Sequence, residues 1–214
     1  MNLILNTALA ERYADPGEME AEVRRAQGFY GELAGLTPAD PAWGAAGWRN
    51  CREAACELEP IRQKAAEIRK HAEVFVLVGV GGSNQAARAM IEALQAPGGP
   101  EIVYAGNTLS AHYLQKVLRH IQGKSVYINV IAKNFETLEP GSHFRVLRQA
   151  MAARYSPAEL ADRIVLTGTR GSRLQEIAAE NGYTFLPFPE RIGGRYSAFS
   201  PVCLLPIAVA GLDV

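Results

Sequence analysis

The sequence of 214 residues has few cysteines and few aromatic side chains. Its three cysteines, Cys51, Cys56 and Cys203, cannot all pair with one another, and none forms a C-x-x-C motif. The four histidines do not stand at zinc-ligand spacing from them. A disulfide framework and a zinc site are therefore not expected, and we interpret the cysteines as free thiols in a reducing compartment.

An excess of charge of either sign is also missing, since 22 basic residues balance 22 acidic ones. Without a basic field, nucleic acid and anionic membrane surfaces are not expected partners, and any bound anion must be held by local groups. No apolar run approaches the roughly 18 residues that a membrane helix needs. The first ten residues have no positive charge and only a short apolar run, so a signal peptide is not predicted, and the expected location is cytoplasmic.

The first 71 residues have the pattern of a helical region. Asp15 and Pro16 form a typical helix start, with an N-cap followed by proline at the first helical position. The apolar residues that follow recur at spacings of three and four and predict one packing face (Met19, Val23, Ala26, Tyr30 and Leu33). A second helix, with Ile61, Ala65 and Ile68 on one face, is predicted to end near His71.

From residue 72 onward, the pattern alternates between buried strands and amphipathic helices. Five apolar or β-branched runs predict strands: 74–78, 102–104, 126–131, 164–167 and 184–188. Apolar residues at helical spacing lie between these runs. The predicted fold class is therefore α/β, a doubly wound parallel sheet of about five strands over residues 72–214, preceded by the helical region 1–71. Ligands are expected in the loops after Val78, Ile131 and Thr167, beyond the carboxyl ends of the strands.

The loop Gly79–Asn84 joins the first strand to a helix and is rich in glycine. Its backbone amides could face an anion at the helix N-terminus, although a plain tight turn has the same composition. A dinucleotide fingerprint is excluded because Asn84 replaces the last glycine and no acidic residue ends the second strand. A nucleotide P-loop at Gly123–Ser125 is excluded because Leu118 replaces its first glycine and a strand follows.

Several segments together resemble the glucose-6-phosphate isomerase family. The order along the chain is the same as in that family for VGVGGS at 78–83, YAGN at 104–107, NVIAK at 129–133, FRVLR at 144–148, GGRYS at 193–197 and LLPIA at 204–208. The resemblance covers the chain from about Gly47 onward, and GGRYS followed by LLPIA is its most specific part.

The resemblance implies a sugar-isomerase fold that interconverts glucose 6-phosphate and fructose 6-phosphate through an enediol, without metal or organic cofactor. The complete protein would have two such domains, this chain providing the first, and would form a homodimer. Matching positions imply that Arg195 stabilises the enediol as a catalytic residue. They imply that the hexose phosphate is bound by Gly82, Ser83, Ala132, Lys133, Asn134, Phe135, Glu136 and Thr137.

Two departures from the family leave the function open. Ala132, Asn134 and Glu136 stand where hydroxyl residues are expected, and the carboxylate of Glu136 would repel a phosphate dianion. No residue matches the family's catalytic glutamate, histidine or late lysine. Glu53, Glu57 and Glu59 are interpreted as a solvated helix start, and His143 as exposed. The chain is therefore interpreted as the N-terminal part of an isomerase, or alternatively as a sugar-phosphate-binding module without catalysis.

Overall fold

The computed structural model describes residues 6–37, 39–50, 58–95 and 97–214. Contacts divide the chain into two units, residues 1–46 and residues 47–214. This division differs from the boundary expected after residue 71. The physical reason is that α4 (Leu58–His71) buries its predicted stripe, Ile61, Ala65 and Ile68, in the core of the second unit.

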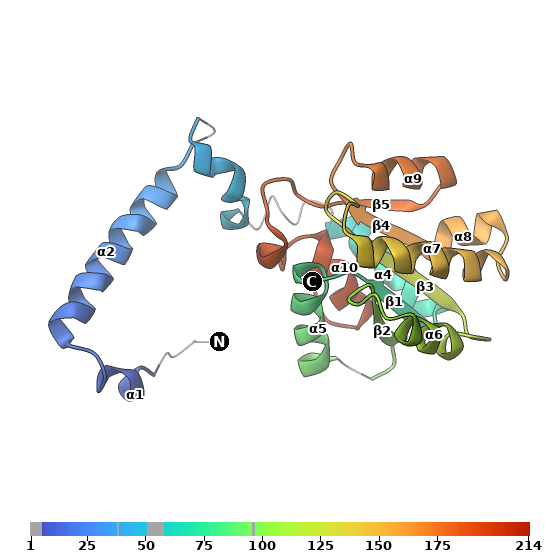
Figure 1. Ribbon diagram of the computed structural model, residues 1–214, viewed down its shortest axis with the longest axis horizontal. Helices are drawn as coiled ribbons and strands as arrows, with labels where there is room; N and C mark the ends of the chain where they lie inside the picture. Colours follow the sequence, from blue (N-terminus) through green and yellow to red (C-terminus); the bar gives the residue numbers. More distant parts are fainter. Residues whose placement is uncertain (1–5, 38, 51–57, 96) are drawn as a thin grey trace. The chain divides into compact units, whose positions relative to one another are not determined.

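The first unit contains α1 (Ala8–Glu11), α2 (Pro16–Gly35) and the short 3-10 helix η1 (Pro41–Ala45) (Figure 1). The start of α2 is as predicted, because the carboxylate of Asp15 accepts hydrogen bonds from the amides of Gly17 and Glu18 at 2.8 and 3.1 Å. The predicted packing face is not buried. No residue of α2 is buried, and Val23 and Tyr30 are 54% and 76% exposed.

The second unit is built on a five-stranded sheet in which every pair of neighbouring strands is parallel. The strand order is β2-β1-β3-β4-β5, which confirms the predicted doubly wound α/β class. After β2 the chain crosses to the other side of β1, so the carboxyl ends of β1 and β3 flank the point where the winding reverses. The strands are β1 (Val74–Val78), β2 (Glu101–Ala105), β3 (Val126–Ile131), β4 (Ile164–Gly168) and β5 (Thr184–Pro187).

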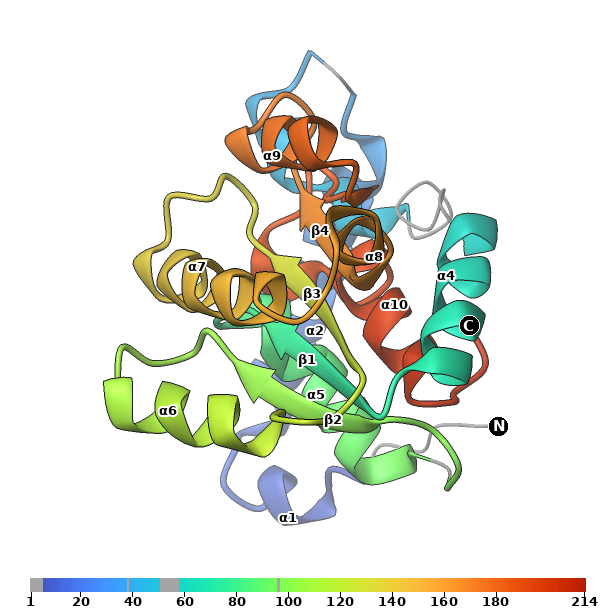
Figure 2. The same cartoon turned by 90° about the vertical axis from the view of Figure 1, so that its right-hand side faces the viewer.

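Helices cover both faces of this sheet (Figure 2). Phe75 and Leu77 of β1 point to one face, beneath α4, α5 (Gly82–Leu94) and α10 (Pro201–Val209). Val74, Val76 and Val78 point to the other face. It is covered by α6 (Ala111–His120), α7 (Leu138–Ala152), α8 (Pro157–Arg163) and α9 (Arg173–Asn181). Because β1 is buried on both faces, its sequence is continuously apolar instead of alternating.

The helix α10 is the most deeply buried helix described, since all nine of its residues are buried. Its Cys203 is a free thiol, as predicted, and burial raises its pKa to about 11. Cys51, Cys56, Glu53 and Glu57 lie outside the described residues. In the part of the chain that the structure describes, no helix combines the length and the apolar character that crossing a membrane would take.

Candidate functional site

The glycine-rich turn between β1 and α5 presents free polar groups at the carboxyl edge of the sheet. Gly81 adopts a φ of 58°, which a residue with a side chain would adopt only at a cost, and α5 begins at the next residue. In the described part of the chain, the amide of Gly82 and the hydroxyl of Ser83 have no hydrogen-bond partner. Asn84 is buried and donates from Nδ2 to the carbonyl of Gly79 at 3.2 Å, which closes the turn.

The GGRYS segment lies directly against this turn. A Cβ on Gly82 would overlap the carbonyl group of Gly194 and lie 2.7 Å from the amide nitrogen of Arg195. Only a glycine at position 82 therefore permits the two backbones to touch. The fold thus brings Gly82 and Ser83 together with the backbone of Arg195, although more than 100 residues separate them in sequence.

Arg195 lies in the short 3-10 helix η3 (Gly194–Tyr196), which side chains around it hold in place. The hydroxyl of Ser197 donates to the carbonyl of Gly194 at 2.7 Å, and Ser197 is fully buried. Trp48 stacks on Tyr196 with ring centroids 5.7 Å apart. The guanidinium of Arg195 itself is exposed and forms no ion pair with any described residue, so it is available to an anion.

Trp48 helps to hold the GGRYS segment in place by stacking on Tyr196, and the sequence did not reveal this role. It follows Gly47, whose amide donates to the carbonyl of Arg191 at 3.1 Å, just before the GGRYS segment. A Cβ on Gly47 would come within 2.6 Å of Cβ of Arg191. In the sequence, the only indication of this contact was the pair Gly47–Trp48 at the start of the region that resembles the family. The pair does not show that residues 191–196 are its partner.

Lys133 makes backbone contacts that the sequence did not predict. Its ammonium donates to the carbonyls of Glu190 and Ile192 at 2.9 and 3.1 Å, and its own carbonyl accepts from the amide of Thr169 at 2.9 Å. Lys133 thereby ties the end of β3 to the segment that leads into Gly193. In this arrangement Lys133 positions the GGRYS segment, and two of the three donors of its ammonium are engaged.

The other residues of the expected phosphate loop differ in their exposure: one is buried, and four line a cleft. Ala132 is buried, whereas Asn134, Phe135, Glu136 and Thr137 line a cleft of about 850 Å³ between α7 and α9. The Nδ2 of Asn134 donates to the carboxylate of Glu136 at 2.6 Å, and the side chain of Thr137, the N-cap of α7, makes no capping hydrogen bond. Gly82, Ser83 and Arg195 do not line this cleft. The predicted binding residues therefore form two groups, which Lys133 connects.

Phe135 departs from ordinary backbone geometry. Among the described residues other than glycine, it alone has a positive φ, 60°. For a bulky side chain, this conformation is strained. The ring of Phe135 packs edge to face on Phe144 with centroids 6.2 Å apart, and this contact offsets part of the strain.

The expectation that His143 is exposed is wrong, because this residue is only 2% exposed. Helix α7 begins at Leu138, earlier than predicted, so His143 lies in its second turn instead of at its start. Its Nδ1 accepts a hydrogen bond of 2.9 Å from the amide of Gly106 in the loop after β2. His143 therefore joins α7 to the YAGN segment and is not a solvent-facing residue.

The burial of His143 predicts a pH-dependent stability. Burial lowers the pKa of His143 below its ordinary value of 6.5. The unfolded chain then binds a proton at this residue more readily than the folded chain, so stability falls as the pH drops below about 6.5. We expect the urea midpoint to decrease between about pH 7 and pH 5, and the decrease to be smaller in His143→Asn. An equal pH dependence in His143→Asn and in the exposed control His112→Asn would contradict this assignment.

No group of three or more histidine, cysteine, aspartate or glutamate side chains in the described ranges is placed to hold a metal ion. The groups that the fold offers to a ligand at the carboxyl edge are instead an amide, a hydroxyl and a guanidinium. These groups donate hydrogen bonds to oxygen atoms, and with the arginine charge they favour an anionic, oxygen-rich ligand.

The chain is similar to proteins of one known family. The family profile described as phosphoglucose isomerase matches residues 62–213. The chain is 39% identical to the glucose-6-phosphate isomerase of Staphylococcus saprophyticus over 164 residues, which are 74% of this chain and 37% of that protein. It is 41% identical to the enzyme of Caldanaerobacter subterraneus over 169 residues, again 74% of this chain and 38% of that protein.

Solved structures give the same result. The hypothetical protein TT0462 of Thermus thermophilus superposes with a TM-score of 0.80 at 26% identity, over 92% of this chain and 47% of that one. A glucose-6-phosphate isomerase of Chlamydia trachomatis superposes with a TM-score of 0.63 at 25% identity, over 81% of this chain and 32% of that one. The chain spans about two fifths of the length of the curated relatives it matches. By its sequence and its fold, the chain belongs to the phosphoglucose isomerase family.

Proposed function

We propose that this chain binds a hexose phosphate at the carboxyl edge of its sheet and takes part in the interconversion of glucose 6-phosphate and fructose 6-phosphate. The observation that carries the proposal is the backbone contact between Gly82 and the segment Gly194–Arg195. This contact brings a free amide, a free hydroxyl and the loop of an unpaired arginine to one edge of the sheet. The names of the curated relatives supply the reaction, which is carried over to this chain as part of the proposal.

In this proposal, the residues have distinct roles. The amide of Gly82 and the hydroxyl of Ser83 donate to oxygen atoms of the sugar phosphate, and the helix N-terminus favours its negative charge. Residues 132–137 form the second wall, where Thr137 supplies the remaining free hydroxyl. Arg195 stabilises the negative charge of the enediol, because a fixed cation is most effective where charge develops. The proton-transferring base comes from outside this chain, in a protein that we propose to be a homodimer.

A second candidate is a sugar-phosphate-binding module without catalysis. Two observations favour it: the ammonium of Lys133 is engaged by backbone carbonyls, and the carboxylate of Glu136 borders the cleft. Both reduce the attraction for phosphate at the second wall. The intact GGRYS segment favours the isomerase, since a binding module has no enediol to stabilise.

The proposal is tested by titrating the chain with glucose 6-phosphate while recording amide chemical shifts. We expect the amides of Gly82, Ser83 and Thr137 to shift in a saturable manner, because they are the free donors at the proposed site. Glu136→Thr should tighten binding by about two- to fivefold, since the removed charge is exposed and screened. Glu136→Gln separates the loss of charge from the gain of a hydroxyl. Unchanged shifts at about 10 mM ligand, a concentration that saturates sites of millimolar Kd, would contradict the proposal.

A further inference from the structure

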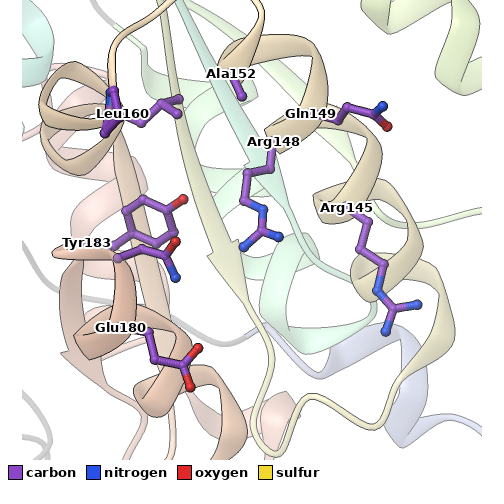
Figure 3. A pocket seen from close by; sticks show the side chains of 9 residues that line it. Arg145, Arg148, Gln149, Ala152, Leu160, Glu180 and Tyr183 are labelled. Atoms are coloured by element: carbon purple, nitrogen blue, oxygen red, sulfur yellow. The ribbon is translucent and has the colours of Figure 1, made fainter.

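A second cavity lies on the helical face formed by α7, α8 and α9. It shares Arg145, Arg148, Glu180 and Asn181 with the cleft that residues 134–137 line, whereas Gly82, Ser83 and Arg195 line neither. Its volume is about 650 Å³, within the range of small-molecule sites. One wall is α7, with Arg145, Arg148 and Gln149, and the opposite wall carries Glu180 near the end of α9 and Tyr183 just beyond that helix (Figure 3). We call this cavity the α7–α9 groove.

Two arginines give the groove a positive charge. Neither Arg145 nor Arg148 forms an ion pair or a hydrogen bond with any part of the chain that the structure describes. Glu180 on the opposite wall lowers this charge only in part, because its carboxylate accepts a hydrogen bond from Arg173 at 2.9 Å. Arg173 also binds Glu176, so these three side chains form their own network beside the groove.

The position of Arg148 is already restricted. Its guanidinium lies over the ring of Phe144, 5.6 Å from the ring centroid, and the side chain is half-buried. Figure 3 shows Arg148 projecting into the space between α7 and the segment that carries Glu180 and Tyr183. A side chain held in this way loses less conformational entropy when a ligand binds, so the site is partly organised in advance.

The spacing of the two arginines indicates which anion fits. Residues at i and i+3 of a helix are neighbours on its surface, so the guanidinium groups of Arg145 and Arg148 can reach one ligand group. Two like charges at this spacing repel each other, and a bound anion relieves this repulsion. A single guanidinium fork occupies both oxygens of a carboxylate, whereas a phosphate has further oxygens, so two forks can bind different oxygen atoms.

From this geometry we infer that the α7–α9 groove binds the phosphate group of a small phosphorylated molecule, at a position that adjoins residues 134–137 but that Gly82, Ser83 and Arg195 do not line. Arg145 and Arg148 bind the phosphate oxygens, and the amide of Gln149 is a further donor on the same wall. The ring of Tyr183, on the opposite wall, supplies apolar surface for the remainder of the ligand.

The inference is tested with inorganic phosphate as the first probe, by recording amide shifts of the intact chain. We expect saturable shifts at Arg148, Gln149 and Tyr183. Arg148→Gln should weaken this binding at least about tenfold, since it removes charge-assisted hydrogen bonds. The matched control is Arg119→Gln, which changes an exposed arginine on α6 and should leave the affinity unchanged. Arg145 is exposed, so Arg145→Gln provides a second variant that does not depend on how the half-buried position 148 tolerates substitution.

Separate readouts distinguish this inference from the proposed function. In Ser83→Ala, the shifts at Arg148 and Tyr183 should persist while those at residue 82 weaken. A glucose 6-phosphate titration then shows whether a sugar phosphate binds the groove more tightly than phosphate alone. The inference is overturned if phosphate moves only the amides near Gly82, or if Arg148→Gln and Arg119→Gln bind it equally well. Neither of these results contradicts the proposed hexose phosphate site.

Discussion

Gly82→Ala is expected to destabilise the second unit and to abolish sugar-phosphate binding. The added Cβ would overlap the carbonyl group of Gly194 and approach the amide nitrogen of Arg195 to 2.7 Å. Both are backbone atoms, so no side-chain rotation can relieve the overlap, and either α5 or η3 must move. Overpacking of this kind costs about 1–3 kcal/mol and occasionally more. The free energy of unfolding, measured with urea, and a glucose 6-phosphate titration provide the two measurements.

The control for this variant is Gly141→Ala, another glycine-to-alanine change in the same unit. Gly141 lies in α7, and the nearest atoms to an added Cβ would be ring carbons of Phe135 at 3.9 Å, an ordinary contact. Alanine is favoured over glycine in a helix, so stability should rise by about 0.5–1 kcal/mol. If Gly82→Ala were as stable as Gly141→Ala, the close approach of the two backbones would not exist in solution.

Most of the sheet could be predicted from the sequence because its strands are buried. The run 74–78 is continuously apolar, and 126–131 is interrupted only by Asn129, which is buried and donates to the hydroxyl of Thr167. Such runs are unmistakable, since a strand covered on both faces exposes no polar side chain. Helix α8 was missed because its seven residues bury only Leu160 and show no periodic stripe. Its start was nevertheless readable, since Ser156 and Glu159 form a capping box.

The candidate site was only partly predictable, for a different physical reason. Glycine-rich segments identify where backbones turn or approach closely, and so Gly82 and the GGRYS segment could be singled out. The partners of polar side chains are set by the fold and not by neighbours in sequence. Lys133 binds the carbonyl of Ile192, and His143 binds the amide of Gly106, 37 residues away in the chain. No local pattern predicts such pairs, and both residues were given other roles on sequence grounds.

The isomerisation itself also needs a base. Moving a proton between adjacent carbons requires a base within hydrogen-bond reach of the substrate, and such a base contributes about 10² to 10⁴ in rate. In the part of the chain that the structure describes, no carboxylate or histidine forms a hydrogen bond or an ion pair with Ser83 or Arg195. Arg195 stabilises an enediol only after the proton has been removed.

We therefore expect the purified 214-residue chain to bind glucose 6-phosphate but not to isomerise it above background. A coupled assay for fructose 6-phosphate measures the rate, and the amide titration shows that the same sample binds the ligand. Joining the chain to the carboxyl-terminal portion of a curated relative should supply the base and produce activity. In that active protein, Arg195→Ala should lower kcat by about 10² to 10³, as for the loss of one group that stabilises developing charge. Robust activity of the chain alone, lost on Arg195→Ala, would show that the base lies within these 214 residues. If the joined protein is active and Arg195→Ala leaves its kcat unchanged, Arg195 takes no part in the reaction.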